Sequence, residues 1–107
     1  MRNVLFALGL ALGCSTVALA DSAQEIWNAK CKACHGEDGR AQTKTGKKEK
    51  IPDMTSPKWQ RHLSDAQIKT TITEGSDENP KMKPFKDKLS EAEIDSLVKH
   101  IRGFAKK

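Results

Sequence analysis

One short segment of the chain combines two cysteines with a histidine, in the order Cys31-Lys32-Ala33-Cys34-His35. The spacing C-x-x-C-H is typical of covalent haem attachment. Two thiols three positions apart can add to the two vinyl groups on one side of a porphyrin, and the adjacent imidazole is then held under the ring, where it can bind iron. The motif therefore predicts one covalently bound haem c, attached through Cys31 and Cys34, with His35 as an iron ligand.

The same two thiols could instead form a disulfide or a thioredoxin-like redox pair. A redox C-x-x-C is typical of a βαβ context, whereas this sequence has no useful stretch of period-two alternation. Zinc binding would need a second pair of ligands at finger-like spacing, which the sequence does not supply. Haem attachment is thus the interpretation that the spacing favours.

A ligand on the opposite face of the iron has four candidates, which are Met82, Met54, His62 and His100. Met82 is favoured because it lies on a proline-punctuated loop just before the last predicted helix, and such a loop can lay a thioether over the ring. Met54 fits the role of a gap-filling core side chain. His62 fits a surface position, and His100 fits packing beside the apolar stripe of the last helix. An iron with five ligands is the remaining alternative.

The first twenty residues have the pattern of a secretory signal peptide. A single charge at Arg2 precedes the apolar run Val4–Leu12, and the segment closes with Ala18-Leu19-Ala20. We expect export to the periplasm and a mature domain of residues 21–107, with a retained segment or lipidation at Cys14 as alternatives. The apolar run is too short for a good spanning helix, so no stable membrane insertion of the mature chain is expected.

The 87 residues of this domain are poor in large apolar side chains, because Leu, Ile, Val and Phe together number twelve. That share, about 14%, lies below the roughly 20% under which a chain is suspected of disorder. Ordering each residue costs roughly 1–2 kcal/mol of backbone entropy. A domain of this composition therefore needs additional stabilisation from a disulfide, a metal, a partner or a large apolar cofactor. A covalent haem supplies a large apolar plate for the side chains to close around. A Rossmann domain, a barrel or a large catalytic fold is excluded.

Three helices are predicted from capping patterns and apolar periodicity. They span Ser22–Cys34, the stretch between Ser64 and Gly75, and the stretch between Ser90 and Gly103. The segments 36–50 and 77–88 are predicted to be loops, and residues 51–59 are predicted to be irregular. The fold class is therefore all-α, with three main helices and long loops wrapped around one covalent haem.

Three segments carry a further signal: C-K-A-C-H-G-E-D-G from Cys31, I-P-D-M from Ile51, and M-K-P-F-K-D-K-L-S-E-A-E-I from Met82. With these segments the chain resembles the class I cytochromes c, the small monohaem kind, over essentially all of residues 21–107. The resemblance implies the small cytochrome c fold. It also implies that His35 and Met82 are the axial pair of the iron.

The resemblance assigns further contacts around the haem. In this family the proline of the middle segment, which is Pro52 here, supplies a carbonyl to the other nitrogen of the proximal imidazole. Trp59 resembles residues whose indole N–H hydrogen-bonds a haem propionate, and core packing explains it equally well. The first and last helices of the family cross through aromatic contacts. Trp27 fits the first helix, whereas His100 stands in place of the usual aromatic residue on the last.

These features predict one-electron transfer and no enzymatic activity, because two axial protein ligands leave no open position on the iron. The sequence also contains no Ser–His–Asp pattern and no carboxylate cluster with an evident role. The prediction is a soluble periplasmic one-electron carrier that shuttles electrons between redox partners. The alternatives are an electron-entry haem subunit of a larger redox enzyme complex and a haem-based gas or redox sensor with a labile Met ligand.

Lysines flank both segments that are predicted to contact the haem, and we call them the lysine collar. They are Lys30 and Lys32 beside Cys31, and Lys81, Lys83, Lys86 and Lys88 around Met82. If both segments border the haem edge, the collar steers transient binding to redox proteins with acidic docking patches. A solvated basic surface is the alternative. Nucleic-acid binding is not expected, and we expect a monomer.

Overall fold

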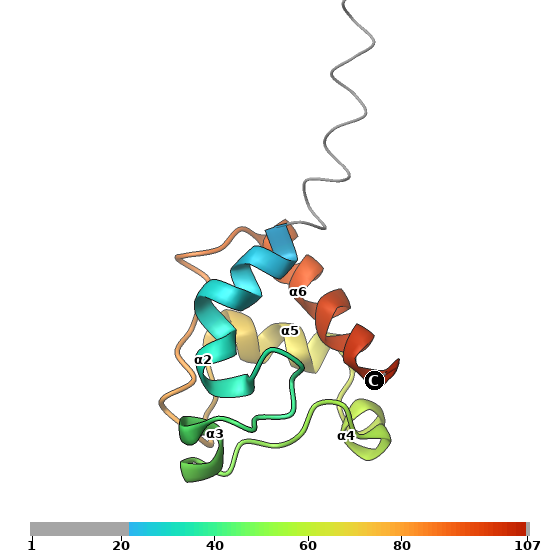
Figure 1. The fold of residues 1–107 in the computed structure, drawn as a ribbon. Helices are drawn as coiled ribbons and strands as arrows, with labels where there is room; N and C mark the ends of the chain where they lie inside the picture. The colour runs from blue at the N-terminus through green and yellow to red at the C-terminus, as the bar shows by residue number, and fades with distance from the viewer. Residues whose placement is uncertain (1–21, 107) are drawn as a thin grey trace, which may run out of the picture.

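A computed structural model describes residues 22–106 of the protein. The predicted signal peptide lies outside the described residues. These residues form helices joined by loops, without strands, which confirms the predicted all-α class (Figure 1). Within the same range, no helix has both the length and the apolar character that crossing a membrane requires. After the N-terminal helical segment come α3 (Lys44–Lys48), α4 (Pro57–His62), α5 (Asp65–Glu74), α6 (Glu91–Gly103) and a 3-10 turn (Phe104–Lys106).

The N-terminal helical segment, residues 22–35, carries the C-x-x-C-H motif, and we call it the attachment helix. Residues 22–26 are α-helical, a π-helical turn follows at Trp27–Cys31, and α2 (Lys32–His35) completes the segment. In the π turn the Lys32 amide donates to the Trp27 carbonyl, five residues earlier. The helix predicted over Ser22–Cys34 is confirmed, while the π turn within it was not predicted. Such turns occur frequently at functional sites.

The helices α5 and α6 begin with the predicted capping boxes. The Ser64 hydroxyl accepts a hydrogen bond from the backbone N–H of Gln67 at 3.1 Å. In return, the side-chain oxygen of Gln67 accepts from the backbone N–H of Ser64 at 2.8 Å. Ser90 and Glu93 repeat this arrangement at the start of α6. The two helices pack against each other through buried apolar side chains, which are Ile68 and Ile72 from α5 and Ile94, Leu97, Val98 and Ile101 from α6.

Aromatic contacts join the attachment helix to the C-terminal helix. The Trp27 ring lies 5.4 Å from the His100 ring, so His100 occupies the crossing that the sequence assigned to it. Phe104 adds an edge contact to Trp27 at 5.0 Å, which the sequence interpretation did not include. Trp27 is only 1% exposed. Two rings from the C-terminal end of the chain therefore hold the attachment helix against α6.

Two segments that were predicted to lack helices contain short ones. The segment 36–50 contains α3, and the segment 51–59 contains the start of α4. The periodicity of apolar residues could not reveal α3, because its five residues are three lysines, a threonine and a glycine. Thr43 caps α3, Ser56 caps α4, and Pro57 occupies the first turn of α4, where its missing N–H costs nothing. Local capping, rather than an apolar face, defines both helices.

Candidate haem-binding site

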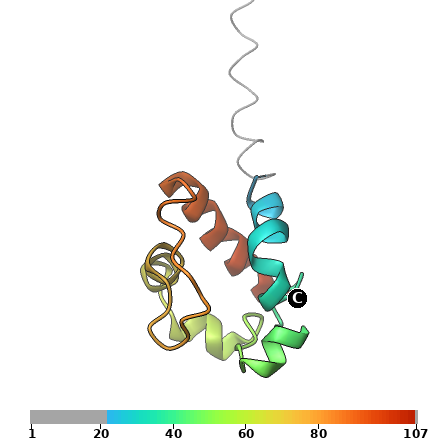
Figure 2. The same ribbon diagram turned by 90° about the vertical axis from the view of Figure 1, so that its left-hand side faces the viewer.

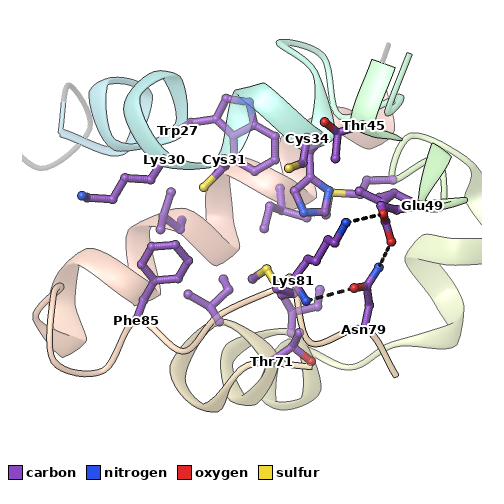
Figure 3. A pocket seen from close by; sticks show the side chains of 18 of the residues that line it. Trp27, Lys30, Cys31, Cys34, Thr45, Glu49, Thr71, Asn79, Lys81 and Phe85 are labelled. Atoms are coloured by element: carbon purple, nitrogen blue, oxygen red, sulfur yellow. Dashed lines mark hydrogen bonds and ion pairs between the residues drawn. The ribbon is translucent and has the colours of Figure 1, made fainter. Parts of the chain in front are cut away.

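A cavity of about 150 Å³ lies between the attachment helix and the segment of residues 76–88, which we call the Met82 loop. Figure 2 shows the attachment helix and the Met82 loop on opposite sides of the molecule. In Figure 3, Cys31 and Cys34 enter the cavity from one side, and Lys81 and Phe85 face them from the other. Apolar side chains from α4, α5 and α6 close the rest of the lining.

Most of the predicted site residues line this single cavity. The structure brings together Cys31, Cys34, His35, Trp59 and Met82. They come from three separate stretches of the chain, of which two carry the predicted iron ligands. Trp59 also packs against the hydrophobic core, as the packing interpretation expects. The convergence on one cavity is what a group held at several points requires.

Both cysteines of the motif carry free thiols and are half-buried. They lie three positions apart, at the end of the π turn and in the short helix that follows, and both side chains line the cavity. Burial raises the pKa of the Cys31 thiol to about 11, while Lys30 acts in the opposite direction. The disulfide alternative is therefore not formed in the structure, and Cys31 is held as a neutral thiol.

His35 follows Cys34 at the end of α2 and also lines the cavity. Burial lowers the pKa of its imidazole, because the low-dielectric surroundings disfavour the charged form. A neutral imidazole is the form that binds a metal ion. His35 is thus in the protonation state that an iron ligand needs.

The contact expected between His35 and Pro52 is absent from the structure. Nδ1 of His35 is buried and has no hydrogen-bond partner among the described residues. Pro52 is exposed and does not line the cavity. The adjacent Ile51 amide donates to the Gly46 carbonyl at 3.0 Å, which ties this part of the chain to α3. The His35 side chain itself lines the cavity, so its imidazole is available for ligation there.

Met82 faces the motif from the opposite side of the cavity. It is half-buried, and its backbone is fixed within its own loop. The Met82 amide donates to the Asn79 carbonyl at 3.0 Å, and the Met82 carbonyl accepts from the Ser76 amide at 3.1 Å. A Cβ atom on Gly75, whose φ is +86°, would lie 3.0 Å from that carbonyl. Glycine at 75 is therefore what lets the chain leave α5 and return so closely.

The other three ligand candidates are placed less favourably than Met82. Met54 lines the cavity, but its amide donates to the Gly39 carbonyl at 2.9 Å, four residues after His35. The backbone of Met54 is therefore held beside the residues that follow His35, and not on the facing Met82 loop. His62 is exposed, and His100 packs against Trp27; neither lines the cavity.

The sequence interpretation missed the residues that fasten α3 to the motif. The Thr43 hydroxyl donates to the Cys34 carbonyl at 2.8 Å and accepts from the Gly46 amide at 2.8 Å. A Cβ atom on Gly46 would lie 2.8 Å from the Cys34 carbonyl oxygen and 2.3 Å from that of Ala41. Only glycine permits this approach. The sequence signal that could have predicted α3 is Thr43, an N-cap residue type three positions before Gly46.

Two members of the lysine collar make ion pairs in the structure. Lys81 pairs with Glu49 at 2.8 Å, and Lys86 pairs with Glu74 at 3.2 Å. The Glu49 pair, together with Asn79, lines the cavity (Figure 3). The hydrogen bond from Lys81 lowers the pKa of the Glu49 carboxyl. Lys81 thus has a partner within the chain, which the collar hypothesis did not include.

The residues present fit a covalently attached haem. The cavity combines two free thiols at the required spacing, a neutral imidazole with a buried unpartnered nitrogen, a thioether from the facing loop, and a mostly apolar lining. Cys31 and Cys34 would hold the porphyrin, and His35 and Met82 would hold its iron. The group would supply the apolar surface that the composition lacks.

Comparison with known proteins gives the family. Residues 18–101 match the family model described as cytochrome c oxidase, cbb3-type, subunit III. The chain belongs to this cytochrome c family. It is a class I cytochrome c, which confirms the resemblance noted in its motifs.

Solved structures agree with this assignment. The KustC0563 c-type cytochrome is 36% identical, with a TM-score of 0.69, and the match covers 77% of this chain and 95% of that one. A point mutant of the same cytochrome gives a TM-score of 0.68 at 36% identity, covering 78% of this chain and 98% of the mutant. The comparison with curated proteins gives no match. The small cytochrome c fold is therefore confirmed.

Proposed function

We propose that this cytochrome is a periplasmic one-electron carrier with a single haem c attached to Cys31 and Cys34. In this proposal His35 and Met82 are the axial ligands of the iron. The observation that carries it is the convergence of these four side chains on one cavity, three from the attachment helix and one from the facing loop.

The side chains around the cavity suit electron transfer rather than catalysis. Haem iron supplies one-electron chemistry by changing between its ferric and ferrous states. The Met82 thioether is a soft, neutral ligand that favours the ferrous state and raises the reduction potential relative to two imidazoles. The lining is mostly apolar, which suits a porphyrin rather than a polar substrate. With a protein ligand on each face, the iron offers no position for a substrate, so we propose no enzymatic activity.

Partner binding in this proposal is transient and electrostatic. The two pairs that Lys81 and Lys86 make within the chain leave the other collar lysines, Lys30, Lys32, Lys83 and Lys88, for an acidic docking patch. Attraction between unlike patches raises the association rate and is screened by salt.

A second function is favoured by the description of the matching family, which is a subunit of an oxidase. In that case the domain would admit electrons to a larger redox complex. The carrier remains our first proposal because it rests on the residues that line the cavity, whereas the electron-entry subunit rests on the family description alone.

Rapid mixing of the reduced protein with CO at neutral pH tests the carrier proposal, when it is combined with purification from its own cells. A carrier with two firm axial ligands leaves CO unbound over seconds and is recovered as a monomer. Fast CO binding would identify a sensor with a labile ligand. Stoichiometric recovery with a larger complex that resists salt would identify an electron-entry subunit. Either result would overturn the proposal that this cytochrome is a carrier.

A further inference from the structure

A polar cluster at the rim of the cavity joins the Met82 loop to the end of α3. The carboxylate of Glu49 accepts from Lys81 Nζ at 2.8 Å and from Asn79 Nδ2 at 3.3 Å. Within the loop, the Lys81 amide donates to the Asn79 side-chain oxygen at 3.0 Å. The Glu49 side chain is 19% exposed and that of Lys81 is 61% exposed. Glu49 is therefore the sheltered member of the cluster, and it contacts Asn79 and Lys81, which lie three residues and one residue before Met82.

Glu49 is itself held in place by the backbone at the end of α3. Its amide donates to the Thr45 carbonyl at 2.8 Å, and the next residue, Lys50, turns the chain with φ of +55°. The Ile51 amide then returns to the Gly46 carbonyl at 3.0 Å. These contacts present the Glu49 side chain from a fixed turn, so that it acts as an anchor and not as a mobile surface charge.

The opposite end of α3 is fastened to the haem-attachment motif. Thr43 donates to the Cys34 carbonyl and also caps α3, and Gly46 lies in backbone contact with Cys34. A continuous path of short contacts therefore leads from Cys34 through α3 and Glu49 to the residues beside Met82. The path crosses from one side of the cavity to the other.

Other polar contacts of the Met82 loop lead elsewhere. The Phe85 and Lys86 amides donate to carbonyls of α5, and the Lys86 side chain pairs with Glu74 at the end of α5. Among the described residues, the polar contacts that join this loop to the chain before residue 52 are the two that Glu49 accepts. Glu49 thus fixes the loop relative to the motif, whereas the other contacts fix it relative to α5.

We propose that Glu49 is a positioning residue for Met82, and that it holds the Met82 loop closed against the cavity. The inference rests on the proposed ligation of iron by Met82. Without the Glu49 carboxylate, the loop loses a charge-assisted hydrogen bond and opens more often by local unfolding. The opening rate or population then limits how fast an external ligand reaches the iron.

The purified holoprotein allows this proposal to be tested by CO binding to the reduced form and by the weak far-red sulfur–iron absorption of the oxidised form. Glu49→Gln removes the charge but keeps an oxygen that can accept from Asn79, and Glu49→Ala removes both. We expect the CO-binding rate to rise about tenfold in Glu49→Ala, with a smaller rise in Glu49→Gln, since hydrogen bonds to charged groups are the stronger kind. Hydrogen exchange at the Met82 amide should accelerate in parallel.

The matched control is Glu74→Gln. This substitution breaks an ion pair to the same loop, at Lys86, on side chains that do not line the cavity. Its CO-binding rate should stay within about twofold of the unmodified protein, because exposed pairs contribute little. Equal effects of Glu49→Gln and Glu74→Gln would overturn the proposal, because the loop would then respond to any lost ion pair.

Lys81→Gln provides a second test that does not depend on the folding of a Glu49 variant, since Lys81 is largely exposed. It should accelerate CO binding as Glu49→Gln does, and the double variant should add less than the product of the two effects. Full multiplication of the effects would contradict the proposed pair. If Met82 does not bind the iron at all, the result is different from a failure of the Glu49 proposal, because Met82→Ala would then leave the spectrum of the oxidised protein unchanged.

Discussion

The pair of helices α5 and α6 is stabilised differently from the region formed by α3 and the Met82 loop. The helix pair buries an apolar stripe, with Leu97 only 1% exposed, and each helix begins with a complete capping box. By contrast, α3 contains no apolar side chain, and the large apolar side chains of the Met82 loop are Met82 and Phe85. Single polar contacts such as the hydrogen bond from Thr43 to Cys34 and the pair between Glu49 and Lys81 join them instead.

This difference indicates which part of the fold depends on the haem. Burial of an aliphatic side chain contributes about 1.5–3 kcal/mol, so the α5–α6 pair carries its own stabilisation. Exposed ion pairs contribute at most about 1 kcal/mol each, which is too little to order long loops. The α3 region and the Met82 loop therefore require the apolar plate that would fill the cavity.

The largest expected effect comes from replacing both attachment cysteines, with Cys31→Ala combined with Cys34→Ala. Covalent haem should be lost completely, as measured by haem stain on a denaturing gel. Amide hydrogens in the segments 36–56 and 76–88 should then exchange as in an unstructured chain, while those of α6 should keep part of their protection. Uniform loss of protection, or uniform retention, would show that the two regions do not differ as described.

A smaller effect is expected in the other region, from Ile94→Ala. Ile94 is only 2% exposed and does not line the cavity. This substitution leaves a void between α5 and α6 and should lower the free energy of unfolding by about 2–5 kcal/mol, measured by denaturant titration of the holoprotein. The visible spectrum should not change, because Ile94 lies away from the proposed haem site. Lys99→Ala on the exposed side of α6 is the control and should stay within about 0.5 kcal/mol. A spectral change in Ile94→Ala would mean that the helix pair and the iron site are not separable.

The smallest effect is expected at the lysine collar. Lys83→Glu should slow electron transfer to an acidic partner a few-fold at low salt, with the difference vanishing at high salt. Lys86→Glu should slow electron transfer less than Lys83→Glu does, because Lys86 already pairs with Glu74. Stopped-flow rates across ionic strength measure both variants. Rates that are the same at all ionic strengths would contradict the collar.

The two regions also differ in how far the sequence predicts them. Ile94, Leu97, Val98 and Ile101 recur at helical spacing beside a capping box, so α6 follows from local rules. The motif likewise predicts the chemistry of Cys31, Cys34 and His35, because attachment depends on spacing within five residues. These predictions need no knowledge of distant contacts.

The contacts across the cavity depend on tertiary structure and could not be predicted in the same way. Glu49 and Lys81 are 32 residues apart, and nothing in the local sequence of either one indicates the other. Helix α3 has no apolar stripe, and its position depends on the absence of a side chain at Gly46. The hydrogen bond expected from His35 Nδ1 to the Pro52 carbonyl rested on resemblance, and His35 Nδ1 has no such partner among the described residues.

In the proposed site Met82, and not Met54, completes the coordination of the iron opposite His35. The far-red sulfur–iron absorption of the oxidised protein tests it directly, in the unmodified chain, in Met82→Ala and in Met54→Ala. We expect the absorption in the unmodified protein and in Met54→Ala, and its complete loss in Met82→Ala, together with a lower reduction potential. Loss in Met54→Ala with retention in Met82→Ala would contradict the claim.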